Sequence, residues 1–155
     1  MAVTPIPEGY HSVTPYLVVK AAAQAIQFYV TAFGAKDTLR LDGPNGEVMH
    51  AELKIGDSHV MIADENPDWG ARGPESFGGS PVSLMLYVED VDAVTAKAVA
   101  AGAKVERPVA DQFYGDRTGT VVDPFGHKWT IGTHQEDMSA QEMQRRAADM
   151  MKPQT

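Results

Sequence analysis

One pattern of residues occurs twice in this sequence, and this repeat constrains the fold more than any other feature. Residues 13–36 and residues 82–104 each begin with an apolar run typical of a strand, continue into an alanine-rich helical pattern and close on Gly-Ala-Lys. In the first helical pattern the apolar residues are spaced to share one helix face, and in the second they do much the same. We therefore expect one strand–helix unit to be used two times.

Each helical pattern is followed by three shorter strand candidates. They are residues 37–41, 48–55 and 58–63 in the first half, and 105–108, 119–122 and 128–133 in the second half. Glycine- and asparagine-containing turns separate them. The predicted fold class is therefore α+β, with two βαβββ modules that pair into a cupped mixed sheet.

The ends of the two helices carry recognisable signals. Gly34 and Gly102 suit the left-handed backbone position that terminates a helix. Asp90 or Asp92 can cap the start of the second helix, because an aspartate oxygen accepts hydrogen bonds from the first free backbone amides. Both helices thus have a C-terminal signal, and the second helix also has a start signal.

Residues 1–155 are predicted to form a single domain. We place the first module at about 11–65, a linker at 66–81, the second module at about 82–134 and a C-terminal helix at 139–152. A sheet with a helix on only one face must cover its other face, so the modules should pair within the chain or between chains, around a cavity. The C-terminal helix has a stripe of methionine and alanine, and we expect it to pack on its own domain or on a partner subunit.

Charge and composition exclude several classes of function. The formal net charge is −8, and the one dense basic spot, Arg145-Arg146, lies among acids, so we expect neither nucleic acid nor a membrane as a partner. The chain has no cysteine, which excludes disulfides and thiolate metal sites and is typical of a cytoplasmic protein. No apolar run approaches the roughly 20 residues of a membrane span, and the first residues are not those of a signal peptide.

Several short motifs, taken in order, resemble one superfamily. They are the segments 13–19, Phe28-Tyr29, 33–35, 49–53, 55–57, 88–92, 111–117 and the Asp-Pro-Phe-Gly-His turn at 123–127. Their spacing resembles that of the vicinal-oxygen-chelate superfamily, and most closely its PhnB-like branch of glyoxalase/bleomycin-resistance-like proteins. The resemblance covers about residues 10–138 and implies the paired-module fold.

The resemblance also implies where a divalent metal would bind, and the residues found there are unsuitable. Carried over by spacing, the four ligand positions fall on Thr14, Ser83, Thr130 and either Val60 or Met61. Metal-using members need histidine, glutamate or glutamine at these places. We therefore expect no metal cofactor and a domain that is stable without metal, although a divalent ion held by other residues stays open.

His50 and Glu52 are the candidate catalytic residues. They are two positions apart on a predicted strand and so share one face of the sheet. If that face lines the cavity, His50 can act as a general base near neutral pH. The alternative is a hydrogen-bonded pair on the solvent face of the sheet.

The candidate ligand-binding residues come from two regions. The segment 111–117 combines Tyr114, Asp116 and Arg117 with further polar and aromatic residues, which is typical of a binding edge; a structural ion pair of Arg117 is the alternative. Tyr16 and Trp129 can form aromatic walls of the cavity, or simply belong to the core.

Two functions follow as hypotheses. The first is a homodimeric protein that binds a small organic molecule in the inter-module cavity without a metal. The second is a lyase- or isomerase-type enzyme in which His50 or an acid moves a proton. The convergence of His50, Glu52 and Arg117 in one pocket would favour the enzyme.

Overall fold

The computed structural model describes residues 2–153 and contains the repeat that the sequence predicts. The first module consists of β1 (Tyr16–Val19), α1 (Ala22–Phe33), β2 (Lys36–Asp42), β3 (Val48–Ile55) and β4 (Ser58–Asp64). The second module consists of β5 (Ser83–Tyr87), α3 (Val91–Ala100), β6 (Lys104–Asp111), β7 (Asp116–Val122) and β8 (Lys128–His134). The linker holds two short helices, η1 (Pro67–Trp69) and α2 (Pro74–Phe77), and α4 (Ala140–Met150) ends the described chain.

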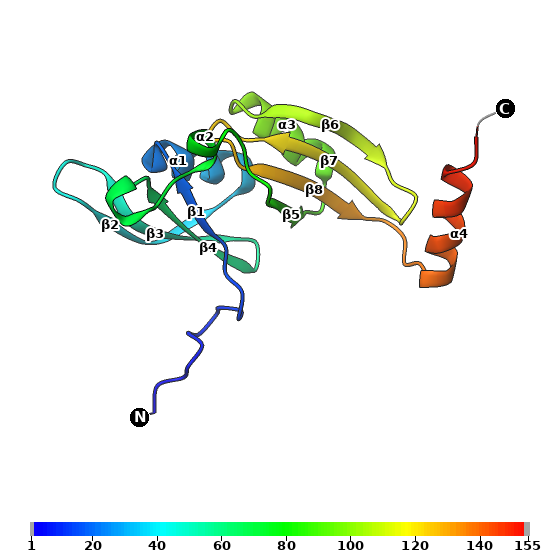
Figure 1. Cartoon of the computed structure of the whole chain (residues 1–155). Coiled ribbons are helices and arrows are strands. Elements are labelled where there is room, and N and C mark those ends of the chain that lie inside the picture. The colour runs from blue at the N-terminus through cyan, green and yellow to red at the C-terminus, as the bar shows by residue number, and fades with distance from the viewer. Residues whose placement is uncertain (1, 154–155) are drawn as a thin grey trace.

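The two modules have the same topology, which confirms the α+β fold class. Their sheets have the strand orders β1-β4-β3-β2 and β5-β8-β7-β6. In each sheet the first strand pairs in parallel with the last strand, and the other pairs are antiparallel. Figure 1 shows the two sheets side by side, with α1 and α3 on the same side of the molecule.

The core lies between the helices and the sheets. In the first module Leu17, Leu53 and Ile62 point at α1 and are almost fully buried, because alternate residues of a strand face the same side. Ile131 of β8 occupies the corresponding place under α3. The two helices also contact each other, so the modules of one chain are joined through their helical sides.

Both main helices are capped by the last strand of their own module. The Asp64 carboxylate accepts a hydrogen bond from the backbone N–H of Ala22 at 2.7 Å, and the Thr133 hydroxyl accepts one from Val91 at 2.9 Å. Each bond satisfies an amide that would otherwise lack a partner at the start of the helix. The helix and the fourth strand of each module are thereby fixed to each other.

The predicted helix ends are found, with one shift. Gly34 ends α1 in the left-handed conformation, with φ of 68°. Asp90, rather than Asp92, caps α3 by accepting a hydrogen bond from the Ala93 amide. The last residue of α3 is followed by Ala101 as its C-cap, and Gly102 comes one position later with φ of 115°.

The segment 111–117 is more regular than the sequence suggests. Asp111 ends β6, and Asp116 and Arg117 begin β7, so that only residues 112–115 form the turn. Gly115 provides the reversal with φ of 94°. The polar and aromatic residues of this segment are therefore the ends of a β-hairpin.

The C-terminal helix stands away from both modules (Figure 1). The Ser139 hydroxyl caps it by accepting from the Glu142 amide, and Arg146 joins it to the Phe113 carbonyl and the Glu136 carboxylate. No residue of α4 is buried, and Met150 is 67% exposed. The expected packing on its own domain is thus limited to polar contacts at one side of the helix.

Each sheet has an open face, defined here as the face opposite its helix. Tyr16, His50 and Glu52 lie on the open face of the first sheet, and Tyr87 and Asp116 on that of the second. Within residues 2–153 no helix is long and apolar enough to cross a membrane.

Candidate functional site

Three polar side chains form a hydrogen-bonded triad on the open face of the first sheet. The Tyr16 hydroxyl lies 2.7 Å from Nδ1 of His50, and Nε2 of His50 lies 3.2 Å from Oε1 of Glu52. We call this set the Tyr–His–Glu triad. The hydroxyl of Tyr10 donates a further hydrogen bond to the other oxygen of Glu52.

The strand register explains why the triad forms. His50 and Glu52 alternate along β3, so both side chains leave the same face. Met61 of β4 pairs with Glu52 on one side and with Tyr16 of β1 on the other. Tyr16 therefore reaches His50 across a single intervening strand.

The protonation pattern of the triad follows from its contacts. The hydrogen bonds from Tyr10 and then His50 lower the pKa of Glu52, so Glu52 is an ionised acceptor at neutral pH. An ionised carboxylate only accepts, which makes Nε2 of His50 the donor. Nδ1 of a neutral His50 then accepts from Tyr16, whose pKa is raised by burial and by the charge of Glu52.

A pocket of about 650 Å³ adjoins the triad at Tyr16. Its apolar lining includes Val18, Met49, Ala63 and Trp69. Trp69 comes from η1 in the linker, which lies over the end of the first sheet (Figure 1). The triad thus has apolar walls beside it, an arrangement typical of small-molecule sites.

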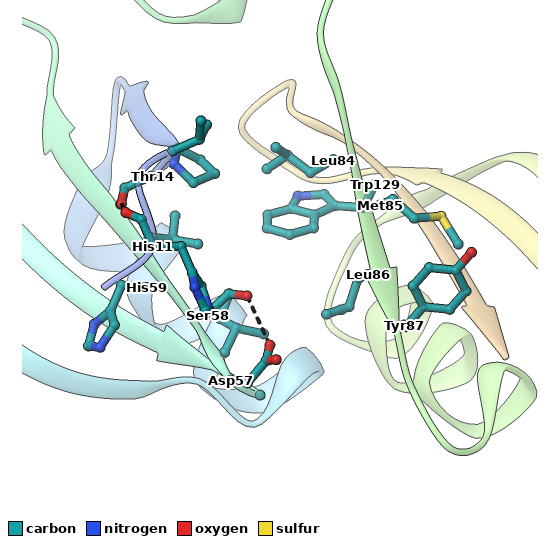
Figure 2. Close-up of a pocket in the computed structure, with 15 residues that line it drawn as sticks. His11, Thr14, Asp57, Ser58, His59, Leu84, Met85, Leu86, Tyr87 and Trp129 are labelled. Atoms are coloured by element: carbon teal, nitrogen blue, oxygen red, sulfur yellow. Dashed lines mark hydrogen bonds between the residues drawn. The ribbon is translucent and has the colours of Figure 1, made fainter. Parts of the chain in front are cut away.

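A second cleft, of about 640 Å³, lies between the two modules of the chain. Figure 2 shows Leu84, Leu86 and Trp129 on one side, facing residues of the first module. His11, Thr14, Asp57, Ser58 and His59 form a polar rim on the first-module side. Of the predicted site residues, only Trp129 lines this cleft.

Trp129 belongs mainly to the core. Its ring is 3% exposed and lies against Phe33 of α1, with ring centroids 4.8 Å apart. Its Nε1 donates to the Asp123 carboxylate at 2.9 Å, and the Tyr29 hydroxyl donates to the same oxygen at 2.5 Å. Trp129 therefore has a structural position, with one edge at the inter-module cleft.

Asp116 lies on the open face of the second sheet. Its carboxylate accepts from the Tyr87 hydroxyl at 2.7 Å and contacts Nδ1 of His134 at 2.6 Å. Burial acts to raise the pKa of Asp116, but the bonds from His134 and Tyr87 outweigh it and the pKa lies below its usual value. Bonds to Asp116 and Asp137 raise the pKa of His134.

Arg117 points to the helical side of the second sheet, away from the open face. Its guanidinium binds Asp92 of α3 through two bonds of 2.8 and 3.0 Å, and Asp111 through one of 3.0 Å. Tyr114 lies in the β6–β7 turn against Phe113, with ring centroids 5.2 Å apart. Within one chain, His50 and Glu52 come together and Arg117 does not join them.

The positions at which the superfamily places a metal carry hydroxyl and apolar groups. The Thr130 hydroxyl bonds to that of Thr120 at 3.1 Å, and the Thr14 hydroxyl donates to the His11 carbonyl at 3.4 Å. In the described part of the chain, no group of three or more histidine, cysteine, aspartate or glutamate side chains is placed to hold a metal ion. This donor set does not fit a zinc- or iron-type centre.

Tyr10 and His59 are residues of this candidate site that the sequence does not predict. Tyr10 lies before the first strand, in a stretch that shows no strand or helix period. His59 lies at the start of β4, where the Tyr10 ring stacks on it. The turn signal Pro7-Glu8-Gly9 directly before Tyr10 was the available indication.

The sequence and the fold of this chain match those of a known protein superfamily. Residues 9–131 match the Glyoxalase/Bleomycin resistance protein/Dioxygenase superfamily, and the chain belongs to this superfamily. The expectation from the sequence motifs is thereby confirmed.

Similar proteins come from bacteria and plants. An uncharacterized protein of Mycobacterium tuberculosis strain H37Rv is 44% identical over 136 residues, which cover 86% of this chain and 80% of that protein. The uncharacterized protein At5g48480 of Arabidopsis thaliana is 36% identical over 123 residues, which cover 73% of each.

Solved structures show the same architecture. TioX from Micromonospora sp. ML1 superposes with a TM-score of 0.63 at 26% identity, over 80% of this chain and 98% of TioX. A PhnB protein from Bacillus cereus gives a TM-score of 0.64 at 18% identity, over 79% of this chain and 99% of that protein, and this likeness concerns the fold alone.

Proposed function

We propose that the protein binds a small organic molecule at the open face of its first sheet, with the Tyr–His–Glu triad as the polar recognition element. The observation that carries this proposal is the triad itself. Three hydrogen-bonded, partly exposed polar side chains adjoin, through Tyr16, a mainly apolar pocket of about 650 Å³. A few fixed polar groups in an apolar hollow can orient a ligand. The donor set supports binding without a divalent metal.

We further propose that the working form is a homodimer. Both sheets have an open face, and these faces carry exposed apolar residues such as Leu41 and Met85, which are 52% and 45% exposed. Packing the first sheet of one copy near the second sheet of another would turn the open faces into the walls of a cavity. The ligand would then lie between modules of two chains.

Ligand screening by thermal shift with matched variants tests the site. Molecules that raise the melting temperature of the wild type should lose this effect in Tyr16→Phe and His50→Ala. Thr31→Ala, at an exposed position of α1 away from both the triad and the inter-module cleft, is the control and should keep it. Ligands that stabilise all three variants equally, but lose their effect in Leu86→Trp, would place the site in the inter-module cleft instead.

A proton-transfer enzyme is the second candidate, favoured by the orientation of His50. Glu52 holds the Nε2–H side of the imidazole and leaves Nδ1 facing Tyr16, the arrangement of a base with an orienting carboxylate. Incubating a screening hit in D₂O distinguishes the candidates. Deuterium entering a carbon position with wild type, and not with His50→Gln, indicates an enzyme; a ligand recovered unchanged indicates binding alone.

A further inference from the structure

The segment before β1 contains a turn, Pro7–Tyr10, that presents Tyr10 to the open face of the first sheet. The Tyr10 amide donates to the Pro7 carbonyl at 3.1 Å, which closes a four-residue turn. Gly9 occupies the third position with φ of 81°, as a type II turn requires. A Cβ on Gly9 would lie 3.4 Å from Nε2 of His59, so the turn rests directly on this ring.

Tyr10 makes two contacts of different chemistry on the sheet. Its hydroxyl donates to Glu52, and its ring stacks on His59 with centroids 4.0 Å apart and planes 14° apart. The contact with Glu52 raises the pKa of Tyr10 to about 12. Glu52 and His59 therefore hold a neutral phenol by its hydroxyl and by its face.

The remainder of this segment is loosely attached. Residues 2–9 are all exposed, and Val3 and Ile6 are 91% and 48% exposed. Removing Tyr10 from the sheet breaks one hydrogen bond and one ring contact and disturbs no strand. A ligand that makes the same two contacts can therefore replace it.

We propose that Glu52 and His59 form a binding subsite for a phenolic ring, and that Tyr10 is its intramolecular occupant, displaced by a ligand with an aryl hydroxyl group. This inference rests on the proposed function, because Glu52 also belongs to the Tyr–His–Glu triad. It adds the chemical class of the ligand.

The charge of Glu52 explains why a hydroxyl is selected. A carboxylate only accepts hydrogen bonds, and its second oxygen already contacts His50. The free acceptor position therefore needs a donor, and an aryl carboxylate would be repelled by the negative charge. The flat ring of His59 favours an aromatic group over an aliphatic alcohol of the same size.

The probe for this subsite is p-cresol, which is the tyrosine side chain without its backbone. Isothermal titration should show that Tyr10→Ala binds p-cresol at least about tenfold more tightly than wild type, because an internal occupant that fills the site nine-tenths of the time weakens apparent affinity by this factor. Tyr10→Phe should show a smaller gain, since the phenyl ring still stacks. Glu8→Ala, in the same turn, is the matched control and should bind like wild type.

Two further measurements assign the binding to the hydroxyl contact. Toluene, which lacks the hydroxyl, should bind Tyr10→Ala more weakly than p-cresol does, and the double variant Tyr10→Ala/Glu52→Gln should lose most of the gain. 4-Nitrophenol near neutral pH should lose its yellow phenolate absorbance on binding, because the carboxylate favours the neutral phenol. Circular dichroism and melting curves check that each variant is folded.

The outcomes separate this inference from the proposed function. Equal p-cresol affinity of wild type and Tyr10→Ala, or an unchanged affinity in the double variant, would overturn the phenol subsite even if screening hits depend on Tyr16 and His50. Tight binding of p-cresol to Tyr10→Ala, without any hit that depends on Tyr16, would support the subsite and overturn the proposed function. If Tyr10→Ala does not fold, Tyr10→Phe is tested in its place. Its affinity for p-cresol must then exceed that of the wild type, and an equal affinity would overturn the subsite.

Discussion

Asp123 is the residue on which the contact between α1 and the second module depends. Its two carboxylate oxygens accept hydrogen bonds from four donors: the Tyr29 hydroxyl, the Trp129 ring N–H and the backbone amides of Phe125 and His127. The residue is 4% exposed, so water cannot replace this acceptor. The aspartate of the Asp-Pro-Phe-Gly-His motif at 123–127 therefore has a structural role, as the shared acceptor of these four donors.

Replacing Asp123 by alanine should lower the free energy of unfolding by about 3–5 kcal/mol, because several buried donors lose their acceptor at once. Urea unfolding of the variant and the wild type measures the difference. Asp37→Ala, at an exposed position of β2, is the matched control and should stay within about 0.5 kcal/mol of wild type. A similar small effect at Asp123 would contradict the buried network.

His134 makes stability depend on pH through its contacts with Asp116 and Asp137. The pKa of His134 is raised in the folded state. Its contribution to the free energy of unfolding is therefore fully present below the pKa of the unfolded state, and it is lost as the pH rises through the pKa of the folded state. His134→Gln should therefore destabilise the protein more at about pH 5.5 than at about pH 9. Urea unfolding at both pH values, with the exposed His11→Gln as control, tests this; equal destabilisation at both would count against the ion pair.

The sequence predicted part of the site, at the level of single residues. The period of two along β3 was enough to place His50 and Glu52 on one face. The partners Tyr16 and Tyr10 depend on strand order and on a turn that crosses the sheet, which local patterns do not encode. Arg117 points to the helical side of the second sheet, opposite to Asp116, because the two residues are neighbours in β7 and neighbouring side chains of a strand point in opposite directions.

Among the elements, the regular ones were predictable and the edges were not. The predicted strand 48–55 has the same bounds as β3, because a clear alternation and two turns delimit it. The predicted strand 105–108 ends at Pro108, whereas β6 continues to Asp111. An edge strand tolerates a proline where its register is irregular. The linker at 66–81 contains η1 and α2, which the sequence does not predict because both are too short to produce a helical period.

The helix α4 is the element that most needs a partner. An isolated helix of 11 residues is marginal in water, and salt bridges of Arg145 and Arg146 with Glu142 contribute little at the surface. We expect the methionine stripe of α4 to pack on a partner subunit, so deleting residues 139–155 should change the size or the solubility of the particle. Gel filtration with light scattering measures this; a truncated protein of unchanged size and stability would show that α4 has no role in assembly.

At the scale of the whole molecule, stability should not depend on a metal ion. The positions at which metal-using members of the superfamily bind their ion are occupied by residues such as Thr14, Ser83 and Thr130. A metal ion stabilises a folded protein by mass action only where the protein binds it. EDTA should therefore shift the melting temperature by less than about 1 °C. Metal analysis of the undialysed protein is the companion measurement, and near one equivalent per chain together with a marked fall in melting temperature would overturn the expectation.

The parallel pairing of the first and last strand in each module also sets an order of events during synthesis. Tyr16 leaves the ribosome long before Met61, its partner in β4, so β1 must wait unpaired until the whole first module has been made. Ser83 and Lys128 impose the same delay on β5. Pairs so distant in sequence are slow to close, and each module should therefore acquire its structure late and in one step, the first while the second is still being translated.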